Sequence, residues 1–315
     1  MVNSAVFAGL AAGALWGFVF VVPKILVGFD SSFVALGRFI FFGVFSLAII
    51  LVQWKKFKAS ISRDAVKKAF LFALLGNSLY YYFLVLGIRY AGITASSLLV
   101  GLLPVTVAIA GNRGRITTRM LPSLTLIMWG VLLVNVHLFF ENRVVMTQNV
   151  SVDSFAAAWG ILFLIGALAL WTWYAVANSK FLKANPKISG NLWSSLTGAF
   201  TLIFSPLIAL SQVFSNSAAN PFSVPHTSAD WVAFFAWSAV LGCGSSWLAL
   251  WLWNTASKKL STTLSGQLIV SETVFALLYG FILEHRFPTY LETAAMISMI
   301  LGVIWAIRSD TQKTI

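Results

Sequence analysis

Long apolar runs of about 20 residues dominate the chain, and short polar or basic connections separate them. A helix needs about 20 apolar residues to cross the hydrocarbon core of a bilayer. The pattern therefore predicts an all-α polytopic membrane protein with ten transmembrane helices. The expected spans are residues 4–27, 32–53, 69–88, 92–112, 120–140, 154–177, 190–213, 231–253, 262–283 and 288–307.

Composition narrows the class of protein further. Of the 315 residues 59% are hydrophobic and 10% are charged, against roughly 25% charged residues in soluble domains. This balance excludes a disordered chain and an ordinary soluble enzyme, and the connections are too short to form a separate domain. The single cysteine, Cys243, excludes an internal disulfide framework and a cysteine-rich metal site.

The basic residues predict how the chain threads the membrane. Sixteen of the 21 Lys and Arg residues fall on one set of connections and the C-terminal tail, and three fall on the other set. The positive-inside rule then places both termini in the cytoplasm. The net charge of +12 does not indicate a nucleic-acid partner, because the charges are scattered over short loops.

The chain contains an internal repeat. Residues 14–16 recur at 169–171, an offset of 155, and residues 94–108 correspond to 263–277, an offset of 169. Each half holds five spans, an odd number, so the halves enter the membrane from opposite sides. This is the inverted-repeat plan of secondary transporters, whose substrate site lies near the midplane. The two expected five-helix repeats are residues 1–142 and 143–315.

Four passages carry a resemblance to a known family. They are Leu15-Trp16-Gly17 with Lys24, Leu36-Gly37-Arg38-Phe39, residues 95–105, and residues 272–276 leading to Leu283-Glu284 and Gly302. In these passages, across nearly its whole length, the chain resembles the drug/metabolite transporter superfamily, in particular the ten-helix EamA-type branch. Thr273 stands where that family usually has a second proline, so the halves are less symmetric there than is typical.

The resemblance implies export or exchange of a small organic metabolite across the bacterial inner membrane, by alternating access around a midplane cavity. Amino acids, aromatic ones included, are the favoured substrates, with drugs or nucleoside-type metabolites as the alternative. The resemblance implies no cofactor. The expected partners are the lipid bilayer and the substrate, while proton coupling and the oligomeric state are left open.

Three charged residues within spans are candidate functional groups. Glu272 falls near the middle of its span, where a charged acid costs roughly 2.5 to 3.5 kcal/mol. It either carries a coupling proton, binds a substrate ammonium group, or ties two helices together. Arg38 and Lys24 either attract a substrate carboxylate or extend their side chains toward water, which is the favoured interpretation for Lys24 and, by a smaller margin, for Arg38.

Aromatic and polar residues suggest the lining of the cavity. At the offset of 169, Ser78 and Tyr82 map onto Trp247 and Trp251, whereas Tyr80 and Tyr81 map onto aliphatic residues. We therefore expect one stripe of each helix to face the cavity. The expected lining is Trp16, Ser78, Tyr82, Trp171, Trp247 and Trp251, and the Trp residues near span ends, Trp253 among them, are assigned to the membrane interface.

Backbone features suggest further candidates. Pro104 lies mid-span, where it removes a backbone hydrogen bond, and carbonyl groups freed beside Ser96 and Gln267 could bind substrate. Local packing explains these residues equally well. Gly13 and Gly17 continue a four-residue repeat that begins at Gly9; we read it first as close helix packing and second as a hinge for rocking.

Other function classes find less support in the sequence. No aspartate falls within a span, and the chain lacks a zinc-protease motif, a nucleophile elbow and a phosphate-binding loop. These absences argue against a membrane enzyme, a metal site and ATP hydrolysis. No run of like charges marks a channel filter, while a membrane protein that only binds partners remains an open alternative.

Overall fold

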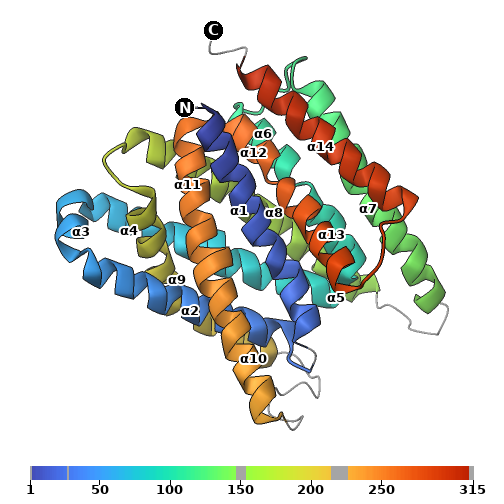
Figure 1. Cartoon of the computed structure of the whole chain (residues 1–315), viewed down its shortest axis with the longest axis horizontal. Coiled ribbons are helices and arrows are strands. Elements are labelled where there is room, and N and C mark those ends of the chain that lie inside the picture. The colour runs from blue at the N-terminus through green and yellow to red at the C-terminus, as the bar shows by residue number, and fades with distance from the viewer. Residues whose placement is uncertain (1, 27, 147–153, 214–225, 312–315) are drawn as a thin grey trace.

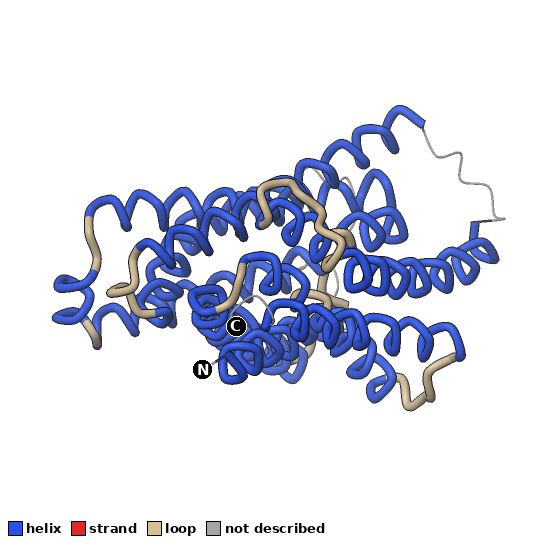
Figure 2. The backbone as a smooth tube through the Cα atoms, turned by 90° about the horizontal axis from the view of Figure 1, so that it is seen from above, coloured by secondary structure: helices blue, strands red, loops and turns tan. Residues whose placement is uncertain are grey.

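The computed structural model describes residues 2–26, 28–146, 154–213 and 226–311. Within these ranges the regular structure is entirely helical, and short loops join the helices (Figures 1 and 2). The helices of the first half are α1 (Val2–Ile25), α2 (Ser31–Val52), α3 (Trp54–Ser60), α4 (Arg63–Phe72), η1 (Ala73–Leu79), α5 (Tyr80–Gly101), α6 (Leu103–Gly111) and α7 (Leu121–Met146). Those of the second half are α8 (Ser154–Ala184), α9 (Gly190–Val213), α10 (Ser228–Ala239), η2 (Val240–Leu248), α11 (Ala249–Lys259), α12 (Thr262–Leu268), α13 (Ser271–Leu283) and α14 (Tyr290–Thr311).

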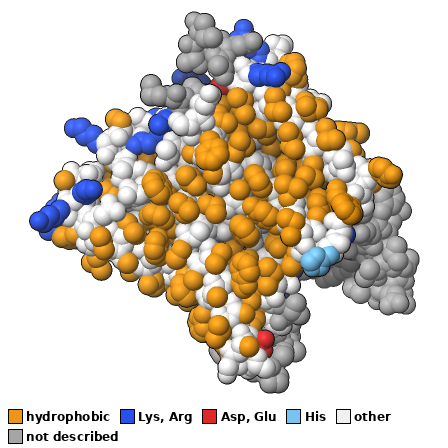
Figure 3. All heavy atoms as spheres, in the orientation of Figure 1, with side chains coloured by type: hydrophobic (Ala, Val, Ile, Leu, Met, Phe, Trp, Pro, Cys, Tyr) orange, Lys and Arg blue, Asp and Glu red, His pale blue; other side chains and the backbone are white. Residues whose placement is uncertain are grey.

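The exterior of the molecule is that of a protein embedded in lipid. Among the described residues, seven helical segments are long and apolar enough to cross a bilayer, and residues 95–111 and 121–136 form shorter apolar helices. Large apolar side chains such as Ile203 and Val232 lie exposed, and hydrophobic side chains cover most of the face seen in Figure 3. The chain is a multi-pass membrane protein, as expected, while the count of ten spans stays a prediction.

Two of the expected spans contain a π-helical segment. The segment η1 joins α4 to α5, and η2 joins α10 to α11. Their first residues, Ala73 and Val240, lie 167 positions apart, close to the offset of 169 seen in the sequence. A π-helix bonds residue i to i+5, so each segment widens the helical turn and shifts the direction of the side chains that follow.

Two other expected spans are interrupted near their middles. The α-helical hydrogen bonding is interrupted at Leu102, between α5 and α6, and again at Ile269 and Val270, between α12 and α13, although all three residues keep right-handed helical dihedral angles. A further break lies within α5 at Gly92, whose φ of 84° suits glycine. The Ser96 hydroxyl donates a hydrogen bond to the Gly92 carbonyl at 2.7 Å and so satisfies one acceptor at this break.

Pro104 therefore lies in the first turn of a new helix rather than in the interior of a continuous one. Its missing N–H is not needed there, because the first N–H groups of a helix have no intrahelical acceptor. Leu102 itself keeps helical dihedral angles and its N–H bonds to the Leu99 carbonyl, so the chain stays helical through this point with one tighter turn. Residue 142, the expected end of the first half, likewise lies inside α7, which continues to Met146.

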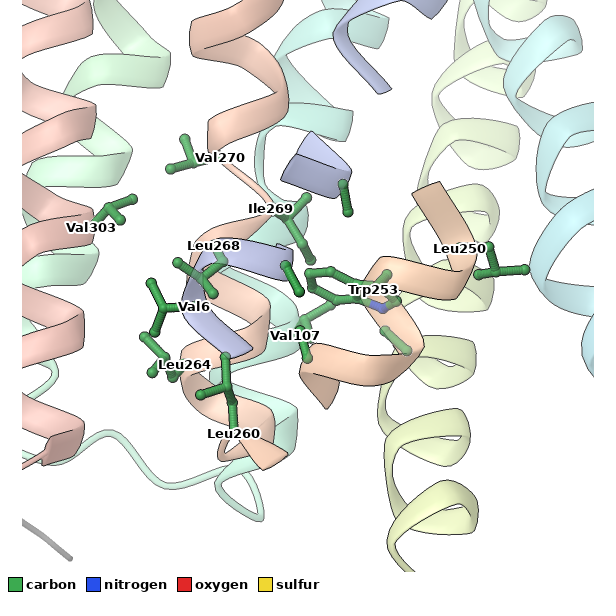
Figure 4. Close-up of a cluster of buried hydrophobic side chains, with 14 of the residues drawn as sticks. Val6, Val107, Leu250, Trp253, Leu260, Leu264, Leu268, Ile269, Val270 and Val303 are labelled. Carbon is green, nitrogen blue, oxygen red and sulfur yellow. The ribbon is translucent and has the colours of Figure 1, made fainter. Parts of the chain in front are cut away.

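The helix α1 runs through the centre of the bundle and packs against α11, α12 and α13. Around it α2 packs on α9, α6 on α8, and α7 on α14. Figure 4 shows part of the buried core, where Val6, Val107, Trp253, Leu264 and Leu268 converge from four different helices. This apolar core fixes the helices around the polar and aromatic residues described below.

The glycine repeat of α1 produces the close approach that the sequence predicts. A Cβ atom on Gly13 would lie 2.0 Å from Ser271 Oγ and 3.1 Å from the backbone nitrogen of Glu272. One on Gly17 would lie 3.0 Å from the backbone nitrogen of Ala276. The first turn of α13 therefore sits directly against the α1 backbone.

A buried chain of hydrogen bonds links α8, α9 and α11. Asn178 donates to Asn254 Oδ1 at 2.8 Å and accepts from Trp193 Nε1 at 2.7 Å. Asn254 in turn donates to Ser194 Oγ at 3.0 Å. All four side chains are fully buried, so the network holds the three helices in one relative position.

Candidate functional site

Two residues of opposite charge meet at the centre of the bundle. Arg38, about two turns into α2, and Glu272, in the first turn of α13, lie close enough to interact electrostatically. The interruption before α13 places Glu272 in the first turn of a helix, where the helix dipole favours a negative charge. Both residues are only partly buried.

The first turn of α5 adds two phenol groups to this pair. Tyr81 lies within electrostatic range of Arg38, and its ring packs edge-on against Phe39 with centroids 5.5 Å apart. Tyr80 lies within electrostatic range of both Glu272 and Arg38. The two hydroxyl groups supply neutral hydrogen-bonding partners beside the two charges.

Indole rings from three helices form an aromatic wall around Trp16 of α1. The Trp16 ring lies 6.5 Å from that of Trp171 on α8 and 5.3 Å from that of Trp253 on α11. Tyr80 joins the wall, with its ring 6.4 Å from Trp171. The aromatic wall and the charged pair are therefore connected through one tyrosine.

This arrangement suits recognition of a ligand that carries both signs of charge. A guanidinium group binds carboxylates through paired N–H donors. A carboxylate binds an ammonium group, and indole faces attract cations and stack on flat rings. Within the described residues no cluster of three His, Cys, Asp or Glu side chains marks a metal site.

Only some of the residues expected to line the cavity lie near the charged residues and the aromatic wall. Trp16 and Trp171 lie together, as the repeat suggested. Trp247 instead donates from Nε1 to Ser195 Oγ at 2.8 Å, inside the interface between η2 and α9. Trp251 stacks near Trp247 and lies against Gly190 at the start of α9.

Tyr80 and Tyr81 are the tyrosines that approach the charged residues. Tyr81 lies within electrostatic range of Arg38, and Tyr80 within range of both Arg38 and Glu272. Within the described ranges no ring contact involves Tyr82. The expected cavity stripe of Ser78 and Tyr82 stays a prediction, and the π segment η1, which contains Ser78, alters the 100° step that relates the two residues.

The other polar candidates lie at some remove from the charged pair. Ser78 is fully buried in η1, and Gln267 is buried in α12; within the described structure, neither Ser78 Oγ nor Gln267 Oε1 has a hydrogen-bond partner. Ser96 bonds to the backbone break at Gly92. Lys24 is exposed and pairs with Glu284 at 2.7 Å, in agreement with the interpretation that it extends toward water.

Sequence reasoning missed Trp253, Tyr80 and Tyr81. The assignment of Trp253 to the membrane interface is wrong, because the residue is 2% exposed and packs on Trp16. Its position near a predicted span end misled the prediction, since α11 continues to Lys259. The one available signal was the two-residue spacing from Trp251, which places the two indoles on different faces of a helix.

Comparisons with known proteins agree with this architecture. The EamA-like transporter family matches the chain over residues 3–136 and 158–308. The chain is 27% identical to the inner membrane protein YtfF of Escherichia coli strain K12 over 321 residues, covering 98% of this chain and 97% of that protein. A solved crystal structure that is 16% identical shares the fold, with a TM-score of 0.73 and 98% of each chain covered. The chain belongs to the EamA-like transporter family, and is thus a membrane transporter.

Proposed function

We propose that this transporter exports or exchanges amino acids, aromatic ones included, by alternating access around a midplane cavity. The observation that carries the proposal is that Arg38 and Glu272 lie within electrostatic range of each other and of Tyr80, whose ring in turn lies near the indole wall of Trp16 and Trp171. An amino acid presents a carboxylate to Arg38 and an ammonium group to Glu272. Its side chain then lies against the indole rings, where flat rings gain most from stacking.

Glu272 is also the proposed coupling group. The α1 backbone packs against the turn that contains it, so movement of α1 changes access to its carboxyl group. A protonated Glu272 loses its attraction for the substrate ammonium group, and this links proton binding to substrate release. Replacement by glutamine removes the proton while keeping the shape of the side chain.

Two inverted five-helix repeats would account for alternating access, and several observations support them. The family matches each half of the chain separately. The π segments η1 and η2 and the mid-span interruptions recur at nearly the same offset. The α1 packing on α13 also has its counterpart in α8 packing on α6, as a two-fold axis in the membrane plane requires.

We further propose that the protein lies in the inner membrane with both termini in the cytoplasm. In Figure 1 the first turns of α1 and the last turns of α14 lie at the same end of the bundle, and in the view of Figure 3 Lys and Arg side chains lie along that upper side and the left edge. The similar protein YtfF is described as an inner membrane protein. Cysteines added singly at each end of a Cys243→Ser chain should react with an impermeant thiol reagent only after the cell is opened.

Counterflow in liposomes tests the transport proposal directly. Vesicles loaded with unlabelled phenylalanine should accumulate labelled phenylalanine, and excess amino acid outside should compete with this uptake. Nucleosides and cationic drugs are tested separately as competitors and as counterflow substrates. Transport of these compounds without transport of amino acids would establish the alternative substrates. Absence of saturable flux with every compound, in protein that remains monodisperse, would favour a membrane protein that only binds partners.

The coupling proposal needs a second measurement. The rate of substrate efflux from wild-type vesicles should change when a pH gradient is imposed. Counterflow should proceed without a pH gradient, because the unlabelled substrate inside the vesicles drives it. Glu272→Gln should lose the response to the gradient and should also lower the apparent affinity in counterflow, because glutamine resembles the protonated acid and no longer attracts the substrate ammonium group. An unchanged response in that variant would overturn the coupling role and leave the substrate assignment intact.

A further inference from the structure

A crevice of about 620 Å³ opens between α6 and α8, on the side of α8 that faces away from Trp16. Its volume lies within the range of about 300 to 1,000 Å³ typical of small-molecule sites. The walls are largely apolar and include Ile165, Trp173 and Val176, while Lys180 stands at one end. Ile165 and Trp173 are 49% and 42% exposed, so the crevice opens toward the lipid.

The corresponding groove in the other half of the molecule, between α1 and α13, is filled by a side chain. There the Tyr279 ring of α13 stacks on Phe18 of α1 with centroids 4.4 Å apart, and its hydroxyl donates to the Ala14 carbonyl at 3.1 Å. Tyr279 also lies against Gly17, where an added Cβ would approach its ring to 3.1 Å. A side chain of the protein itself therefore seals the groove between α1 and α13.

The offsets of the repeat explain why the second groove stays open. At an offset of 155, Gly17 and Phe18 correspond to Thr172 and Trp173, and at 169 Tyr279 corresponds to Ala110. Thr172, Trp173 and Ala110 all line the crevice. Alanine thus stands where the other half has a tyrosine ring, and the space that the ring would occupy is empty of protein.

The two threonines that face each other across the crevice need no ligand. Thr106 and Thr172 share a hydrogen bond of 2.8 Å between their hydroxyl groups. The remaining walls offer an occupant apolar contact, which suits a hydrocarbon chain. From Ile165 to Lys180 the helix rises about 22 Å at 1.5 Å per residue, enough to line an acyl chain through one leaflet of about 15 Å.

Basic residues at the Lys180 end of the crevice favour a lipid whose head group is anionic. Lys180 is exposed, and α6 ends at the same end of the crevice, followed by the exposed Arg113 and Arg115. Anionic lipids bind such basic groups at a membrane surface. We propose that the crevice binds one phospholipid with an anionic head group, whose acyl chain takes the place of the missing ring beside Ala110. The proposal does not depend on which substrate the transporter carries.

Native mass spectrometry of the detergent-purified full chain tests the proposal, with phosphatidylglycerol and phosphatidylcholine titrated separately. Wild type should retain one phosphatidylglycerol in preference to phosphatidylcholine. Lys180→Gln should reduce that preference about fivefold, the factor expected for one basic residue near a membrane surface. Lys187→Gln, which removes an exposed lysine from the loop after α8, serves as the matched charge control and should leave the preference unchanged.

Filling the crevice provides the second variant. Ala110→Tyr should abolish retention of the single lipid, because the new ring occupies the space as Tyr279 does in the other half. Its thermal unfolding midpoint and elution volume show whether the variant is folded. Equal lipid retention by wild type and a folded Ala110→Tyr, or a preference unaffected by Lys180→Gln, would overturn the proposal and indicate only an unspecific lipid shell.

Discussion

Arg38 donates from Nε to the Ser246 hydroxyl at 2.7 Å, and this bond joins α2 in the first half to η2 in the second. Arginine has five N–H donors, so this bond uses one of them and orients the others. The guanidinium group is thus held by the protein before a substrate arrives. Orientation of this kind favours two-point binding of a carboxylate.

Arg38→Lys should therefore impair transport although it keeps the positive charge. A lysine ammonium group cannot reproduce the planar set of donors, and a hydrogen bond to a charged group contributes about 1.5 to 3 kcal/mol. We expect the apparent affinity for phenylalanine in counterflow to fall at least about tenfold. Ser246→Ala should cause a smaller loss, because it removes only the group that orients Arg38. Wild-type affinity in Arg38→Lys would contradict the carboxylate role.

Trp16→Phe should weaken transport of aromatic substrates more than that of aliphatic ones. Contacts between aromatic rings contribute about 0.5 to 1.5 kcal/mol beyond burial, which predicts about a two- to tenfold change in the phenylalanine-to-alanine counterflow ratio. Trp129→Phe is the control, because Trp129 is 58% exposed on the lipid-facing surface. An unchanged ratio in Trp16→Phe would separate the aromatic wall from substrate recognition.

Gly13→Ala should destabilise the protein, since the added methyl group would lie 2.0 Å from Ser271 Oγ. Forcing an atom into a packed interface typically costs about 1 to 3 kcal/mol, measurable as a lower thermal midpoint in detergent. Gly280→Ala is the matched control, because nothing lies within 4 Å of a Cβ there. Alanine is the better helix former by about 0.5 to 1 kcal/mol, so the control should be neutral or stabilising. Ser271→Ala should restore part of the loss in Gly13→Ala.

The ion pairs of Glu284 should make the folded protein slightly less stable in acid than at neutral pH. The Glu284 carboxylate accepts from Lys24 Nζ at 2.7 Å and from Arg286 Nε at 2.6 Å, and these bonds lower its pKa. A lowered pKa in the folded state contributes stability above the unfolded value of about 4.3, and this contribution is lost as the pH falls through the folded value. The ion pairs are largely exposed, so the contribution is at most about 1 kcal/mol.

Thermal unfolding of wild type and Glu284→Gln should therefore differ slightly at neutral pH. The difference should shrink as the pH is lowered below about 4, where the wild-type carboxylate takes up a proton. High salt should reduce it at neutral pH, because exposed pairs are screened. A difference that persists unchanged in acid would show that Glu284 acts through packing and not through charge.

Much of the fold follows from the sequence because its cause is simple. Apolar runs such as residues 32–53 must become helices in lipid, where every backbone group needs an internal partner. The close packing at Gly13 follows equally directly from a repeat of small residues. The break at Gly92 and the π segment η1 were not predicted, because they depend on tertiary contacts and leave no distinctive pattern in the apolar residues.

The site was predicted less completely, for the same reason. Glu272 and Arg38 stand out as charges within apolar spans, and the repeat pairs Trp16 with Trp171. The choice among the three consecutive tyrosines required the exact angular position of each residue. A helical wheel assumes a uniform step, and η1 alters that step immediately before Tyr80.

The wide turn of η1 holds about one residue more than an ordinary α-helical turn of the same sweep. Deleting one residue within residues 73–79 while the turn closes to an α-helix would therefore leave the later side chains near their present direction. Closing the turn without a deletion would instead rotate every later side chain by about 100° and turn both phenols away from the charges near them. The direction of Tyr80 and Tyr81 thus depends on the hydrogen bonding of the preceding seven residues as much as on their own place in the sequence.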